Sequence, residues 1–139
     1  MKPLEHQCFT LWITPRPGLT LSDELDFVRR LEDYLREREL EISGGPLHTV
    51  VSSASRSLTA TDQVDLIVGL VRDPVVERVA VSPLLRSGSR PAEREAGYIE
   101  APSLDVPVIA LTILYGCGRV SAETVLQILG GFVRPAVVH

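Results

Sequence analysis

One segment of this 139-residue chain occurs twice, and the duplication constrains the fold more than any other feature of the sequence. LTLSDELDFVRRL, at residues 19–31, aligns with LTATDQVDLIVGL, at residues 58–70, and both copies begin and end with leucine. The match predicts two equivalent structural halves, each built around one copy. The polar positions that recur are Thr20/Thr59, Asp23/Asp62 and Asp26/Asp65.

Each copy carries the signals of an amphipathic helix. The threonine near its start can cap free backbone N–H groups, and the first aspartate then lies in the first turn, where negative charge favours the helix dipole. Apolar residues follow at helical spacing, which predicts one buried stripe on each helix. These stripe residues are Leu21, Leu25, Val28, Leu31 and Leu35 in the first copy and Val64, Ile67, Leu70 and Val71 in the second.

Strand-like segments flank both helices. CFTLWIT and LHTVVSS precede the two helices, and LEIS and VAVS follow them, with the alternating polarity and β-branched residues typical of strands. A turn signal, Gly44-Gly45-Pro46, separates the halves. The order strand–helix–strand, repeated, predicts an α+β protein with the ferredoxin-like split βαβ (βαββαβ) arrangement, in which four antiparallel strands carry both helices on one face.

The chain length favours one domain over residues 1–139. Within this domain we expect the ferredoxin-like core at 9–85, a flexible arginine-rich loop at 86–96 and an extension at 97–139. The extension is predicted to continue the sheet at its edge or to pack on the sheet's open face.

The extension has a strand-like and a helix-like part. VPVIALTILY, residues 106–115, is an apolar run that we interpret as a strand. SAETVLQILGG, which begins at Ser121, predicts a short helix, and the tail FVRPAVVH predicts a last strand.

Alternation along the strands assigns their residues to two faces. One face would meet the helices, and the other would stay open and carry Trp12, Leu47 and Val51. An open apolar face marks an interaction site, so the extension, a second copy or a partner should cover it. The predicted helix-facing residues are Phe9, Leu11, Ile13, Val50, Leu40, Ile42, Val79 and Val81, and the open-face residues are Cys8, Thr10, Trp12, Leu47, Thr49, Val51, Glu41 and Ala80.

The sequence carries no catalytic or metal-binding signature. No HxxxH, HExxH or CxxC spacing occurs, so we expect neither a zinc site nor a cofactor. A reactive pair of Cys8 or Cys117 with His48 would require the fold to bring the side chains together. Two cysteines cannot build a disulfide framework, which favours a reduced, cytoplasmic protein.

The turn YGCGR, residues 115–119, gives an alternative interpretation as an anion-binding site. Its glycines, Gly116 and Gly118, lie between a predicted strand and a predicted helix, where phosphate-binding loops occur. The segment has neither GxGxxG nor GxxxxGK[ST], so an ordinary turn is the competing interpretation. Arg119 and His48 complete the residues proposed for a small anionic ligand.

Charge and hydropathy limit the partners. A net charge of −4 argues against DNA and against anionic membranes, which both attract basic surfaces. The longest apolar run is about ten residues, too short to span a bilayer. The start MKPLEHQCFTLW has the pattern of neither a signal peptide nor a transit peptide.

Residues 9–85 resemble the YggL family, small bacterial proteins associated with the large ribosomal subunit. The likeness lies in a strand and PRPG turn, FTLWITPRPG, then an acidic helix, an SGG pair, a Thr-Asp helix and the strand of RVAVSPL. The resemblance implies the α+β fold and makes the ribosome a candidate partner. The basic N-terminal arm of that family has no counterpart in MKPLEHQ.

Together these patterns predict a cytoplasmic, non-enzymatic binding module that forms a homo-oligomer or docks a protein partner through its sheet face or edge. An anion-binding protein or enzyme and a ribosome-associated protein are the alternatives. The predicted contact residues are Trp12, Thr10, Thr49, Val51, Arg86 and Arg90.

Overall fold

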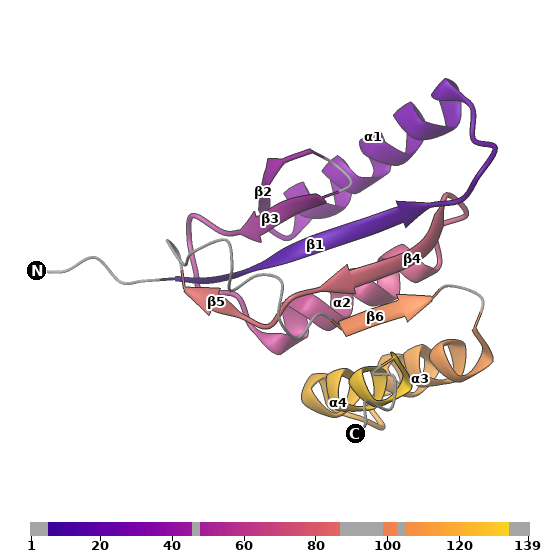
Figure 1. Ribbon diagram of the computed structural model, residues 1–139. Coiled ribbons are helices and arrows are strands. Elements are labelled where there is room, and N and C mark those ends of the chain that lie inside the picture. The colour runs from indigo at the N-terminus through magenta and orange to yellow at the C-terminus, as the bar shows by residue number, and fades with distance from the viewer. Residues whose placement is uncertain (1–5, 46–47, 87–98, 103–104, 134–139) are drawn as a thin grey trace, which may run out of the picture.

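The computed structural model describes residues 6–45, 48–86, 99–102 and 105–133, which form one sheet and a layer of helices (Figure 1). Antiparallel pairing gives the strand order β2-β3-β1-β4-β6, and the two-residue β5 pairs with the start of β1. The strands are β1 (Gln7–Pro15), β2 (Glu41–Gly44), β3 (His48–Ser52), β4 (Val76–Val81), β5 (Leu85–Arg86) and β6 (Ile99–Pro102). The helices are α1 (Leu21–Glu37), α2 (Ala60–Val71), α3 (Val106–Gly116) and α4 (Ala122–Val133).

The predicted ferredoxin-like arrangement is confirmed. Strands β2, β3, β1 and β4 stand in the order of the split βαβ fold, with α1 and α2 on the same side of the sheet (Figure 1). Strand β6 pairs with β4 and so extends the sheet at one edge, which was one of the two predicted places for the extension.

The duplicated helices begin as the sequence indicates. In α1, Thr20 Oγ1 accepts a 3.1 Å hydrogen bond from the Asp23 N–H, and Asp23 Oδ2 accepts a 3.0 Å bond from the Thr20 N–H. In α2, Asp62 Oδ2 accepts a 2.8 Å bond from the Thr59 N–H. Both starts therefore satisfy backbone donors that a helix leaves free.

The buried stripe of α1 contains Leu31 and Leu35 as predicted, but not Leu21 or Leu25. Phe27, Leu31 and Leu35 face the sheet at i, i+4, i+8 spacing, whereas Leu21 and Leu25 are exposed. Helical spacing alone fits both sets, and only the packing partner selects one of them. The stripe predicted for α2 is buried throughout.

The assignment of β3 to the two faces was wrong by one residue. Phe9 lies opposite Val51 and Leu11 opposite Thr49, so Val51 and Thr49 face the helices, and Val50 faces away. A shift of one position moves every side chain of a strand to the other face. Thr49 is tolerated in the core because its hydroxyl donates a 2.9 Å hydrogen bond to the Ser43 carbonyl.

The strand predicted at residues 106–115 is a helix, α3. Asp105 is its N-cap, with the side chain accepting from the Val108 N–H, and a proline lies in its first turn. These are helix-start signals that outweigh the strand-like composition. The helix predicted from Ser121 is α4, and the last strand predicted in the tail is wrong at residues 132–133, which belong to α4. The rest of that tail lies outside the described residues.

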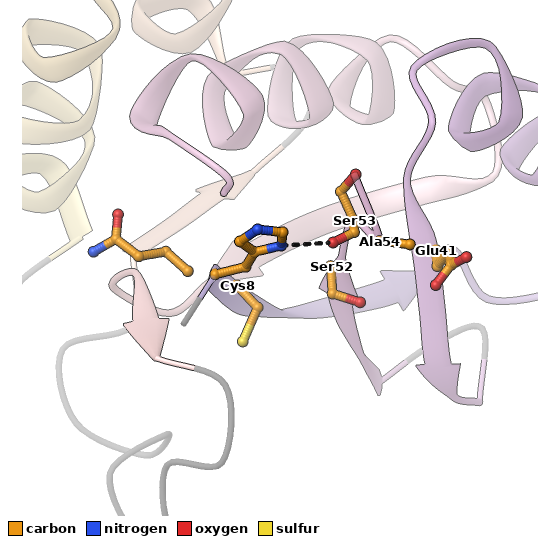
Figure 2. A pocket seen from close by; sticks show the side chains of 7 residues that line it. Cys8, Glu41, Ser52, Ser53 and Ala54 are labelled. Atoms are coloured by element: carbon orange, nitrogen blue, oxygen red, sulfur yellow. Dashed lines mark hydrogen bonds between the residues drawn. The ribbon is translucent and has the colours of Figure 1, made fainter. Parts of the chain in front are cut away.

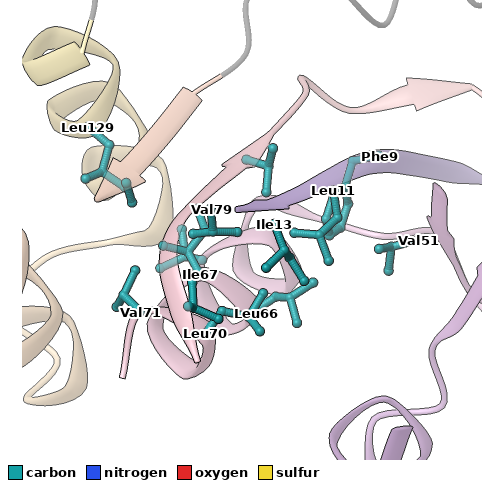
Figure 3. Close-up of a cluster of buried hydrophobic side chains, with 14 of the residues drawn as sticks. Phe9, Leu11, Ile13, Val51, Leu66, Ile67, Leu70, Val71, Val79 and Leu129 are labelled. Atoms are coloured by element: carbon teal, nitrogen blue, oxygen red, sulfur yellow. The ribbon is translucent and has the colours of Figure 1, made fainter. Parts of the chain in front are cut away.

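The hydrophobic core joins the sheet to all four helices. Phe9, Leu11 and Val51 of the sheet, Ile67 of α2 and Leu129 of α4 all belong to this core (Figure 3). All five side chains are at most 1% exposed. The helices therefore cover one face of the sheet, and the other face carries the polar and aromatic residues described next.

Candidate interaction surfaces

The open face of the sheet carries an aromatic pair. Trp12 on β1 lies opposite His48 on β3, and the two rings stack with centroids 3.6 Å apart and planes 12° apart. Trp12 remains 44% exposed. Nearby on this face, Arg78 and Glu100 form a 3.8 Å ion pair across β4 and β6.

Three of the six predicted contact residues are buried. Thr10 lies on the open face but is only 1% exposed, and Thr49 and Val51 belong to the helix-facing layer. Arg86 ends β5, where it pairs with Gln7, and Arg90 lies outside the described residues. Of Trp12, Thr10, Thr49 and Val51, only Trp12 has an exposed side chain.

The turn at residues 115–119 is the C-terminal cap of α3. Gly118 has φ +74°, its N–H donates to the Tyr115 carbonyl, and the Arg119 N–H donates to the Leu114 carbonyl. This pair of bonds is a Schellman motif, which explains the glycine without a ligand. The turn does not join a strand to a helix, as the phosphate-loop interpretation assumed.

The structure does not assemble the predicted anion site. Gly116, Gly118 and Arg119 lie in the helix layer, next to α4, and His48 lies on the opposite face of the sheet. Arg119 is exposed at the end of α3. The four residues proposed for one ligand are therefore divided between two sides of the molecule.

A pocket of about 260 Å³ lies at one end of the sheet, lined by residues that include His6, Cys8, Glu41 and Ser53. The His6 ring donates through Nδ1 to the Ser53 carbonyl at 3.4 Å. Figure 2 shows the Glu41 carboxylate directed away from Cys8. Within the described ranges, no group of three or more His, Cys, Asp or Glu side chains is arranged to hold a metal ion.

The predicted pairing of a cysteine with His48 does not form. His48 lies opposite Trp12, four residues along β1 from Cys8, which is about 13 Å in an extended strand. Cys117 is the exposed C-cap residue of α3.

Helix α3 presents the largest set of exposed aliphatic side chains among the described residues. No charged residue occurs in VPVIALTILYG, so the helix is apolar on all sides. One side packs inward through Val108 and Leu111, which are at most 5% exposed. The outward side, which we call the α3 stripe, consists of Val106 (76% exposed), Ile109 (41%), Ile113 (54%) and Leu114 (44%).

A hydrogen bond between helices fixes the direction of the stripe. The Tyr115 hydroxyl donates to Asp65 Oδ1 on α2 at 2.7 Å. Burial of the phenol, together with this carboxylate, raises the pKa of Tyr115 to about 12. Helix α3 therefore lies against α4 and α2 with one defined side turned outward (Figure 1).

The α3 stripe was not predicted, because the composition of residues 106–115 favours a strand. The stripe positions 106, 109, 113 and 114 have helical i, i+3, i+7, i+8 spacing, but the intervening residues are equally apolar and hide the period. The signal available was the Asp105-Val106-Pro107 start, an N-cap residue with proline in the first turn.

Comparisons of the chain with protein-family models, with curated proteins and with solved structures give no match. The resemblance of residues 9–85 to the YggL family, and the ribosome as partner, stay predictions. Across the parts of the chain that the structure describes, no helix has both the length and the apolar character to cross a membrane.

Proposed function

We propose that this chain is a non-enzymatic interaction module that self-associates, and that the α3 stripe is its contact surface. The observation that supports the proposal is the exposure of Val106, Ile109, Ile113 and Leu114 on one side of a helix without charged residues. Partner docking through the sheet face or edge was the expectation from sequence. The contact surface proposed here lies on the helix layer instead.

Exposure of the α3 stripe to water costs free energy. Single exposed aliphatic residues are normal on protein surfaces, but a contiguous strip of them marks a contact site. Full burial of each Val, Leu or Ile side chain is worth roughly 1.5–3 kcal/mol. A helix that is apolar on every side belongs in an interior, and self-association supplies that interior.

A protein surface fits the stripe better than a lipid surface. Helices that lie on anionic membranes carry lysine and arginine along their polar face. The sequence of α3 contains neither, and the whole chain has a net charge of −4. Contact with another apolar protein surface needs no such basic face.

Light scattering after size-exclusion chromatography tests the proposal. We expect wild-type protein to elute above the mass of one chain at micromolar concentration and Ile113→Glu to elute at 15.2 kDa. Leu21→Glu is the matched control, because Leu21 is also an exposed aliphatic helix residue but lies on α1. An Ile113→Glu protein with the wild-type mass would refute α3 as the contact surface.

The stacked pair of Trp12 and His48 supports a second candidate surface, the open face of the sheet. An exposed tryptophan held flat by a neighbouring ring is a rigid contact of the kind enriched in interfaces. We expect Trp12→Arg to weaken association if this face takes part. A Trp12→Arg protein with unchanged stability and unchanged mass would remove the sheet face from the proposal.

A further inference from the structure

We infer that the occupant of the α3 stripe is α3 of a second copy of the chain, lying antiparallel to the first across a two-fold axis. The inference rests on the proposed self-association and adds the identity and direction of the contacting element. It follows from charges at the two ends of α3 and from the position of the stripe between them.

The ends of α3 carry opposite charges. Asp105 is the N-cap residue, and Arg119 follows the C-terminal cap, exposed to solvent. The salt bridges found among the described residues do not include either side chain. An antiparallel neighbour would place Asp105 of each copy beside Arg119 of the other, whereas a parallel neighbour would bring like charges together.

The helix dipoles favour the same direction. Antiparallel packing sets the positive N-terminal end of each helix against the negative C-terminal end of the other. A two-fold axis across the helices makes every contact occur twice, as in most homodimers.

One axis satisfies both the apolar and the charged contacts. The stripe runs from Val106 to Leu114 and is centred near residue 110, and the Asp105–Arg119 span is centred near residue 112. An axis at residue 111, between the two centres, sets Asp105 two residues from Arg119 of the second copy and Val106 two residues from its Leu114, about 3 Å along the helix in each case. Ala110, which is small and exposed, lies at this centre, where helix axes must approach to about 8–10 Å.

The arrangement places a native thiol beside a specific position of the second copy. With the axis near residues 110–112, Cys117 of one copy lies against the first turn of α3 in the other, at about Val106. Cys117 and Val106 are both exposed, so a disulfide between these positions needs no unfolding.

A disulfide-trapping experiment with the full chain tests the direction. In a Cys8→Ser background, Val106→Cys leaves thiols only at positions 106 and 117. We expect mild oxidation to link position 106 of one copy to position 117 of the other, as identified by peptide mass spectrometry. Ile113→Glu added to this variant should abolish the link, which controls for random collision.

The outcomes separate the inference from the proposed function. A dimer by light scattering that yields only 106–106 and 117–117 links has parallel helices, and it overturns the inference while leaving self-association intact. A dimer without any link shows that α3 contacts another surface and also overturns the inference. A protein that stays monomeric at all concentrations refutes both the proposed self-association and the antiparallel arrangement.

A charge reversal gives a second test that does not depend on oxidation. Arg119→Asp should weaken dimerisation by about tenfold, because two ion pairs become two repulsions. Arg29→Asp is the control, since Arg29 is an exposed arginine on α1, away from the stripe. An Arg119→Asp dimer of wild-type affinity contradicts the antiparallel arrangement.

Discussion

Tyr115 of α3 donates a 2.7 Å hydrogen bond to Asp65 of α2, which ties the added helix to the duplicated one. Asp65 is one of the three polar positions that the two copies share, and its counterpart is Asp26 in α1. The second copy of the repeat thus holds the helix that carries the α3 stripe. The same bond keeps the inward side of α3 against α2 and α4 and leaves the stripe outside.

Tyr115→Phe should lower the free energy of unfolding by about 1.5 kcal/mol, because it leaves a partly buried carboxylate without its donor. Urea denaturation followed by circular dichroism measures the change. An unfolding free energy equal to that of the wild type would mean that the bond does not hold α3 in place.

Tyr34→Phe should act in the opposite direction. The Tyr34 hydroxyl is buried and has no hydrogen-bond partner among the described residues, and burial raises its pKa to about 12. Removing a buried, unpaired hydroxyl should raise the free energy of unfolding by about 1 kcal/mol. The same urea titration tests this, and a loss of stability would show that the hydroxyl has a partner after all.

Alkaline titration should report both tyrosines. Their pKa values of about 12 lie above the ordinary 10.0, so the folded state holds the phenolic protons more tightly than the unfolded state. Their contribution to stability is therefore complete below pH 10 and is lost as the pH rises through about 12. Ultraviolet difference absorbance should show two phenols ionising late in wild type and one in Tyr115→Phe. Ionisation of both near pH 10 would contradict the buried placement.

Acid should weaken the fold through Asp62. Burial opposes its ionisation, but the 2.7–2.8 Å hydrogen bonds from Arg56 and the bond from the Thr59 N–H hold the pKa of Asp62 below its ordinary 3.8. The stabilisation that the ionised Asp62 carboxylate provides is complete well above pH 3.8. It is lost as the pH falls through the lower pKa that Asp62 has in the folded state.

The variant Asp62→Asn isolates that contribution. We expect it to cost about 1 kcal/mol at pH 7 and to flatten the acid limb of the stability curve. Glu32→Gln, at an exposed position on α1, is the control and should keep the wild-type acid limb. If Asp62→Asn kept the wild-type acid limb, the Asp62 carboxylate would not be the group responsible.

The repeat and its helix caps made the fold predictable. Thr20 and Asp23 form local bonds whose geometry depends only on nearby residues, so sequence spacing identifies them directly. The order of strands and helices then leaves few topologies for a compact sheet.

The face of β3 depended on distant residues. HTVVS is rich in β-branched side chains on both faces, so alternation does not distinguish inside from outside. Pairing with β1, which sets Val51 opposite Phe9, decides the register, and that pairing is a tertiary contact.

The period of the apolar residues does not identify the α3 stripe either. A helix that is apolar all round shows no contrast between faces, and only its neighbours decide that Leu111 is buried and Ile113 is not. The expected contact surface on the sheet rested on Trp12, Leu47 and Val51 sharing the open face, and Val51 in fact faces the helices.

Sedimentation equilibrium of the wild-type chain over a wide concentration range tests self-association through α3 most directly. We predict an apparent mass that rises with concentration from 15.2 kDa to twice that value, and a constant 15.2 kDa for Ile113→Glu. A wild-type mass of 15.2 kDa at every concentration, or an Ile113→Glu protein that dimerises as well as the wild type, would contradict the proposal.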